Sequence, residues 1–92
     1  MQDLKLEIDT PWIRAYRLTL LKGNNFILSS SKRSLILISL NAATMQTKQS
    51  GKTENQTLKA GSFFVIKRKD LFSLKNTSDN TVQFVLLEQP VQ

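Results

Sequence analysis

The 92-residue chain contains neither histidine nor cysteine. The absence of cysteine excludes disulfides, thiol nucleophiles and cysteine-ligated metals, and the absence of histidine removes the commonest metal ligand and general base. The sequence also lacks a glycine-rich phosphate loop, a nucleophile elbow and zinc-ligand spacing. We therefore expect no metal and no cofactor, and the sequence favours a non-catalytic protein over an enzyme.

Long apolar runs are missing as well. No stretch of about 18 apolar residues is available to cross a membrane. The first nine residues carry Asp3, Glu7 and Asp9, whereas a signal peptide has a basic stretch followed by an apolar run. We expect a cytoplasmic protein.

The composition is that of a folded chain, with 40% hydrophobic and 22% charged residues. Its length accommodates one domain with a modest core, so residues 1–92 are predicted to form a single unit. Thirteen Lys and Arg against seven Asp and Glu give a net charge of +6, which favours anionic partners. The nine lysines are scattered along the chain, so a nucleic-acid surface is not expected.

Short β-rich runs alternate with turn residues about every ten positions, a pattern typical of an all-β sandwich or barrel. About nine strands are predicted, at residues 4–8, 12–21, 26–29, 35–40, 44–48, 54–58, 62–66, 71–75 and 82–87. The run 35–40 is apolar on both faces, so we expect a central strand and the most buried segment. Residues 44–58 form a more polar hairpin that we expect to face solvent.

Arg14 and Arg17 fall on one predicted strand, on opposite faces because side chains alternate along a strand. An inward arginine needs a counter-charge, for which Glu88 and Asp9 are candidates, or it binds an anionic ligand. On the same strand, Trp12 and Tyr16 share a face and are predicted to be core or dimer contacts.

The segment from Gly61 to Asn76 resembles the second signature of the cupin family. That signature runs Gly, five residues, Pro, one residue, Gly, two residues, His, three residues, Asn. Gly61 and Asn76 stand at its ends, and Lys67, Lys69 and Phe72 replace its Pro, Gly and His. The spacing is kept and the histidine ligand is lost.

The first cupin signature is matched upstream by spacing. With its leading glycine on Gly23, its two histidines fall on Ser29 and Ser31, and its glutamate on Leu35 or Ile36. The resemblance implies a small single-domain jelly-roll barrel of about nine short antiparallel strands that has lost its metal ligands. A two-sheet sandwich of other topology is the alternative. The family also implies a homodimer, formed by sheet extension.

A candidate ligand site follows from the same resemblance, because the family strand order brings two cationic segments near the opening of the barrel. Arginine suits phosphate or carboxylate, and serine hydroxyls add neutral hydrogen bonds. Phe72 either lines this pocket or is simply core. The candidate ligand-binding residues are Arg14, Ser29, Ser31, Lys32, Arg33, Lys67, Arg68 and Phe72.

The leading hypothesis is a metal-free, non-catalytic cupin-like domain that binds a small anion or acts as a dimeric protein-interaction module. The alternative is a metal-independent isomerase or epimerase acting on a sugar or small organic acid. Such an enzyme would use Arg, Lys or Tyr16 as its acid or base.

Overall fold

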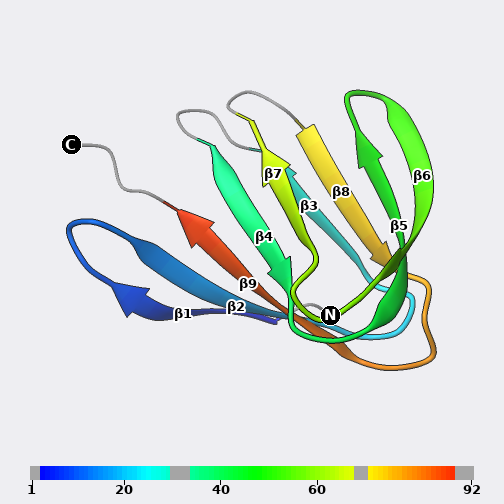
Figure 1. The fold of residues 1–92 in the computed structure, drawn as a ribbon, viewed down its shortest axis with the longest axis horizontal. Helices are drawn as coiled ribbons and strands as arrows, with labels where there is room; N and C mark the ends of the chain where they lie inside the picture. The colour runs from blue at the N-terminus through cyan, green and yellow to red at the C-terminus, as the bar shows by residue number, and fades with distance from the viewer. Residues whose placement is uncertain (1–2, 30–33, 68–70, 89–92) are drawn as a thin grey trace.

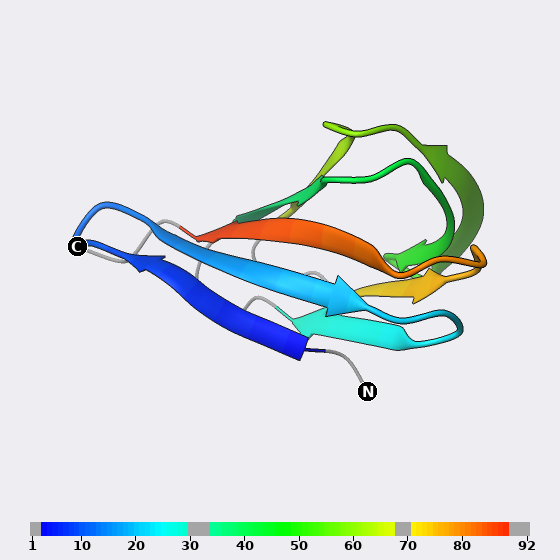
Figure 2. The same cartoon turned by 90° about the horizontal axis from the view of Figure 1, so that it is seen from below.

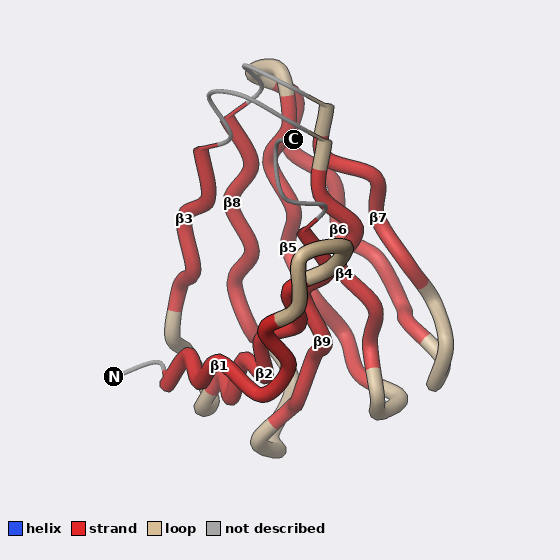
Figure 3. The backbone as a smooth tube through the Cα atoms, turned by 90° about the vertical axis from the view of Figure 1, so that its left-hand side faces the viewer, coloured by secondary structure: helices blue, strands red, loops and turns tan. Residues whose placement is uncertain are grey.

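The structure, a computed structural model, describes residues 3–29, 34–67 and 71–88. These residues form nine antiparallel strands and no helix, which confirms the predicted all-β class (Figure 3). The strands are β1 (Asp3–Asp9), β2 (Arg14–Leu20), β3 (Asn25–Ser29), β4 (Leu35–Ser39), β5 (Ala43–Gln49), β6 (Lys52–Leu58), β7 (Phe63–Ile66), β8 (Leu71–Asn76) and β9 (Val82–Glu88).

The strands form two sheets that face each other (Figures 1 and 2). The five-stranded sheet has the order β1-β2-β9-β4-β7, and the four-stranded sheet has the order β3-β8-β5-β6. Strands distant in sequence pair in register: Arg14 lies opposite Glu88, and Met45 lies opposite Asn76. The chain passes repeatedly from one sheet to the other, so both sheets are built from segments of both halves.

The space between the sheets is filled by apolar side chains. They come from alternate positions of the strands, as the two-residue period of a strand requires. Fully buried side chains include Leu18, Leu37, Met45, Phe72 and Phe84. They belong to one cluster, against which Tyr16, Leu28 and Phe64 pack. Burial of this cluster is the main favourable term in folding.

The strand predicted at 12–21 begins at Arg14, because Thr10 closes a tight turn before it. The hydroxyl of Thr10 donates to the carbonyl of Ile13 at 3.0 Å and accepts from the backbone N–H groups of Ile13 and Trp12. Trp12 is therefore in a turn and 71% exposed, so it is not a core residue, and the alternative of a dimer contact stays a prediction.

The strand β4 lies between β9 and β7, as a central strand should. Leu35, Leu37 and Ser39 are buried, whereas Ile36 on the opposite face is exposed. The central position is confirmed, but the expectation of the most buried segment fails on the outer face, where Ile36 is 39% exposed because no second layer of described residues covers the five-stranded sheet on that side. The prediction that the β5–β6 hairpin faces solvent holds for one of its faces only. On the other face, Ala43, Met45, Thr47 and Leu58 point into the core.

The described residues include no helix of the length and apolarity that crossing a bilayer requires.

Candidate functional site

The three residues identical to the cupin motifs shape the backbone. Gly23 and Gly61 adopt positive φ angles of 79° and 91°, a region that glycine enters without the steric penalty of a side chain. The N–H of Gly23 donates to the carbonyl of Asn76 at 2.9 Å, and the N–H of Gly61 donates to the carbonyl of Ser39 at 2.7 Å. The retained motif residues thus join turns to neighbouring strands.

The side chain of Asn76 is fully buried and fully used. Its amide nitrogen donates to the carbonyls of Leu20 at 2.9 Å and Asn80 at 2.7 Å. Its oxygen accepts from the backbone N–H of Ser78 at 3.0 Å and from the Ser78 hydroxyl at 2.6 Å. A buried amide satisfied in this way fixes the β8–β9 turn against the end of β2.

The positions that would carry metal ligands have become part of the core or lack strong ligand chemistry. Leu35 and Phe72 are buried and apolar, and Ile36 points to the outer face. Ser29 ends β3 opposite Leu71, and Ser31 lies outside the described residues. Serine hydroxyls are neutral and bind first-row divalent metals weakly. Nor do any three His, Cys, Asp or Glu side chains gather into a metal site within the described parts of the chain.

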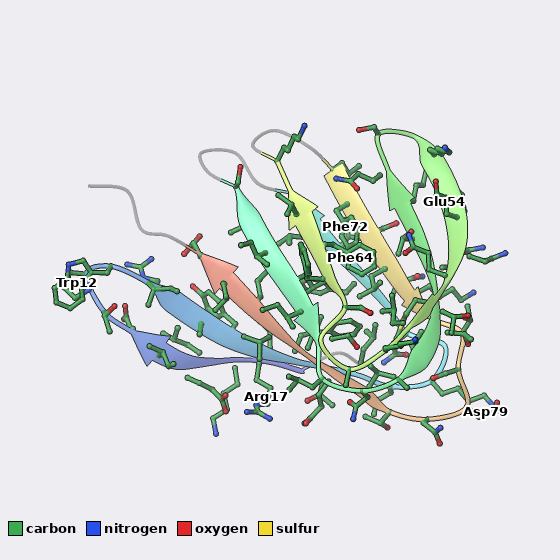
Figure 4. The ribbon with its side chains drawn as sticks, viewed as in Figure 1. Trp12, Arg17, Glu54, Phe64, Phe72 and Asp79 are labelled. Atoms are coloured by element: carbon green, nitrogen blue, oxygen red, sulfur yellow. The ribbon has the colours of Figure 1, made fainter. Side chains whose placement is uncertain are left out.

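Aromatic rings occupy the interior beside these positions. The ring centroids of Phe64 and Phe72 lie 5.4 Å apart with their planes inclined at 46°. Figure 4 shows both rings between the two sheets. Tilted aromatic pairs at this distance are favourable beyond the area they bury. Of the two interpretations of Phe72, its complete burial in the hydrophobic cluster fits a core residue.

A polar cleft remains next to the ring pair. It measures about 230 Å³ and opens beside the β5–β6 hairpin; we call it the mouth cleft. Its lining residues are Thr47, Gln49, Ser50, Lys52, Glu54, Gln56 and Phe64. Gln49 lies opposite Phe72 in the sheet register, so the cleft adjoins the position of the lost histidine ligand.

Hydrogen bonds organise the lining of the mouth cleft. Gln56 Nε2 donates to the Thr47 hydroxyl at 2.9 Å, and Gln49 Nε2 donates to the carbonyl of Val65 at 3.4 Å. The second bond connects the two sheets across the open side of the barrel. At the rim, Lys52 Nζ and Glu54 Oε1 form an ion pair at 3.3 Å. The cleft thus combines amides, hydroxyls and one neutralised pair of charges over an aromatic ring.

The predicted cationic cluster falls largely outside the described residues. Lys32, Arg33 and Arg68 belong to the ranges 30–33 and 68–70, as Ser31 does. Lys67 is described: it follows the last residue of β7 and is exposed. The anion site therefore stays a prediction. Lys67 is the one cation of this cluster that lies within the described residues.

Arg14 has the two partners that the sequence suggested. Its Nε lies 3.1 Å from Asp9 Oδ1, and its Nη1 lies 3.7 Å from Glu88 Oε1. The hydrogen bond to Asp9 is the main reason that the pKa of Arg14 is raised above its ordinary value. A ligand anion would have to compete with two carboxylates here, although ligand binding by Arg14 is otherwise untested.

Sequence reasoning did not identify the glutamines of the mouth cleft. Gln49 and Gln56 lie on a polar hairpin whose alternation is weak, and β6 is exposed over most of its length. The sequence did contain one indication of their location, because Met45, Thr47 and Gln49 occupy alternate positions and so share one face of β5. Only the pairing of this hairpin with β8 brings that face next to Phe72.

The sequence matches no protein-family model and no curated protein. Solved structures do resemble it. A cupin domain from Bordetella pertussis superposes with a TM-score of 0.83 at 13% identity, over 98% of this chain and 94% of that one. The Cupin_2 domain of an XRE family transcriptional regulator from Enterobacter cloacae gives 0.78 at 15% identity, over 99% and 98%.

An RmlC-like cupin from Methanocaldococcus jannaschii, described as a double-stranded β-helix, also gives a TM-score of 0.78, at 14% identity over 98% of this chain and 81% of that one. Likeness at such low identity concerns architecture and leaves activity open. The suspected resemblance is thereby confirmed at the level of structure: the chain has the double-stranded β-helix fold of cupin domains.

Proposed function

We propose that this chain is a metal-free, non-catalytic cupin-like domain that binds a small polar ligand in the mouth cleft. The observation that carries the proposal is that one part of the barrel interior is filled by aromatic rings whereas the part next to it is an open polar cleft. The neighbourhood of the lost histidine ligand is filled by the Phe64–Phe72 ring pair, and the adjoining cleft is lined with hydrogen-bonding side chains.

The described lining favours a neutral ligand rich in hydroxyl or amide groups. Gln49 and Gln56 each offer donors and an acceptor, and Phe64 offers an apolar surface to the carbon skeleton of a ligand. The charge of Lys52 is balanced by Glu54, so this part of the cleft does not select an anion. Anion binding, the expectation from the sequence, would depend on Lys67 and on the cations outside the described residues.

The enzyme alternative has one observation in its favour. Lys52 and Glu54 are ionisable side chains that line the cleft, and their charged atoms lie 3.3 Å apart. Tyr16, the other acid–base candidate, packs against the hydrophobic core. A Glu54→Gln variant separates the hypotheses: it abolishes turnover of a sugar if Glu54 transfers protons, and it leaves simple binding of that sugar largely intact.

The proposal is tested by thermal shift and calorimetry with neutral sugars and polyols in one panel, and with phosphate, sugar phosphates and dicarboxylates in another. A ligand at a hundred times its dissociation constant stabilises the fold by about 2.7 kcal/mol, a shift of roughly 10–20 °C in a domain of this size. We expect a neutral compound to bind. A shift with an anion alone would favour the cationic segments as the binding site. No shift and no heat of binding in either panel would contradict a ligand site.

A matched pair of variants locates the binding. Gln56→Ala removes an amide that lines the cleft, and Gln46→Ala removes an exposed amide from the opposite face of the same hairpin. We expect Gln56→Ala to weaken binding about tenfold or more, the equivalent of one lost hydrogen bond, and Gln46→Ala to leave it unchanged. Equal effects of the two variants would place the ligand elsewhere.

A further inference from the structure

The outer side of the four-stranded sheet carries charge of one sign. In this sheet β8 lies between β3 and β5 (Figure 1). The described side chains that alternate with the core positions of its strands include two exposed lysines, Lys48 and Lys75, and no carboxylate. Neither lysine forms an ion pair with a described residue, whereas Arg14 and Arg17 on the other sheet are both paired. This side of the molecule therefore attracts anions.

A groove opens on this outer side, next to the loop of the β5–β6 hairpin. It measures about 300 Å³, at the lower end of the volumes typical of small-molecule sites. Its apolar part consists of Ile27 and Leu71, which are 66% and 61% exposed. The remaining lining residues are Lys48, Ser50, Gly51 and Ser73. We call it the lysine groove.

The polar side chains of the lysine groove have no partners in the protein. The ammonium of Lys48 and the hydroxyls of Ser50 and Ser73 form no hydrogen bond with any described residue. In the sheet register Ser73 lies opposite Ile27 on one side and Lys48 on the other. Side chains opposite one another in a sheet have Cβ atoms about 5 Å apart, so these donors lie within reach of the same apolar surface.

We propose that the lysine groove binds a small aliphatic monocarboxylate. Its carboxylate accepts hydrogen bonds from Lys48, Ser50 and Ser73, and charge-assisted bonds of this kind are the stronger ones. Its hydrocarbon covers Ile27 and Leu71 and so removes apolar surface from water. The lysine groove lies on the outer side of β5 and the mouth cleft on its inner side, although Ser50 lines both, so this ligand is independent of the one proposed for the mouth cleft.

Charge distinguishes this occupant from others. A larger groove of about 600 Å³ lies on the five-stranded sheet between Trp12, Ile36 and Val65, but Glu88 lines it and none of its described lining residues is a cation. A carboxylate would meet a like charge there and an opposite charge in the lysine groove. A second copy is disfavoured in the lysine groove, because two identical outer sides would bring lysines together without a carboxylate between them.

A titration of isotope-labelled protein with octanoate, followed through amide chemical shifts, tests the proposal. A ligand of about ten non-hydrogen atoms in an open groove should have a dissociation constant of about 1 mM, so concentrations of about 0.1–10 mM cover the transition. We expect the shifts to change at Ile27, Lys48, Gly51 and Ser73. No change over this range, or changes confined to the surroundings of Trp12, would overturn the proposal.

Analogues of octanoate test the two parts of the groove separately. Octanamide keeps the hydrocarbon and removes the charge, and we expect it to bind about tenfold more weakly. Acetate keeps the charge and removes most of the hydrocarbon, and it should lose at least as much affinity. Octylammonium reverses the charge and should leave the groove unchanged. Equal affinities for octanoate and octanamide would show that the groove does not recognise a carboxylate.

Two lysines on the same side of the sheet provide a matched pair of variants. Lys48→Gln removes the ammonium that lines the groove, and Lys75→Gln removes the exposed ammonium two residues beyond Ser73 on β8. We expect Lys48→Gln to weaken octanoate binding about tenfold and Lys75→Gln to weaken it less than threefold or so. Equal losses would mean that octanoate responds only to the net charge of +6, and the site would be wrong. Far-UV circular dichroism confirms that both variants are folded.

The mouth-cleft variant separates this proposal from the proposed function. Gln56→Ala lies on the inner side of the hairpin and should leave octanoate binding unchanged. Conversely, a neutral compound that binds in the mouth cleft should bind Lys48→Gln as tightly as the unmodified protein. Octanoate binding that is lost in Gln56→Ala and kept in Lys48→Gln would place octanoate in the mouth cleft and overturn the proposal for the lysine groove.

Discussion

At the scale of single residues, the side chain of Asn76 joins two segments of the chain, the end of β2 and the β8–β9 turn. Replacing it with alanine leaves the carbonyls of Leu20 and Asn80 and the N–H of Ser78 without their partner, and opens a small void. Unpaired buried polar groups cost about 1–3 kcal/mol each, so we expect Asn76→Ala to lower the free energy of unfolding by about 3 kcal/mol or more. Urea denaturation followed by circular dichroism measures the loss.

Asn55 provides the control for this prediction. It lies exposed on the outer side of β6, and Asn55→Ala should change the free energy of unfolding by less than about 0.5 kcal/mol. If Asn76→Ala were as mild as Asn55→Ala, the amide network would not hold the turn, and the match to the cupin motif at this position would have no structural meaning.

At the scale of elements, the loop of the β5–β6 hairpin holds a non-glycine residue, Ser50, at a positive φ angle that another residue would tolerate better. Gln49 pairs with Lys52, so the loop consists of Ser50 and Gly51, both at positive φ, of 53° and 80°. Two-residue loops of this kind favour Asn-Gly, because asparagine tolerates the left-handed region better than serine does. We expect Ser50→Asn to raise the free energy of unfolding by about 0.5–1 kcal/mol and Gly51→Ala to lower it by about 1 kcal/mol or more. A thermal or urea melt that found no difference between the two variants would contradict this account of the loop.

At the scale of the whole molecule, stability and self-association are coupled if the chain forms the homodimer that the cupin resemblance implies. A dimer that unfolds to single chains becomes more stable as protein concentration rises. For a domain of this size, we expect the thermal midpoint to rise by about 3–5 °C for each tenfold increase in concentration. Differential scanning calorimetry at several concentrations measures this slope. A slope near zero in the unmodified protein would mean that the folded chain is a monomer.

Much of the fold could be predicted from the local pattern of apolar and turn-forming residues. Alternating apolar residues and turn-forming Gly and Asn placed the strands, because side chains on a strand alternate between faces and few residues tolerate positive φ. The same reasoning suggested Asp9 or Glu88 as the counter-charge of an inward arginine, and Arg14 pairs with both. It placed the start of β2 two residues too early, because the Thr10 hydroxyl holds Trp12 and Ile13 in a turn before the strand begins.

The sequence by itself determined the all-β class, the approximate strand positions, the absence of histidine and the apolar character of both faces of 35–40. Only the tertiary structure decided which of those faces is covered, because coverage depends on which strands pair and not on periodicity. It also decided that Gln49 and Gln56 meet at the mouth cleft beside Phe72, and that Trp12 projects next to Ile36 and Val65. Phe72 is distant in sequence from Gln49, and Trp12 is distant from Ile36 and Val65, so long-range strand pairing sets these distances.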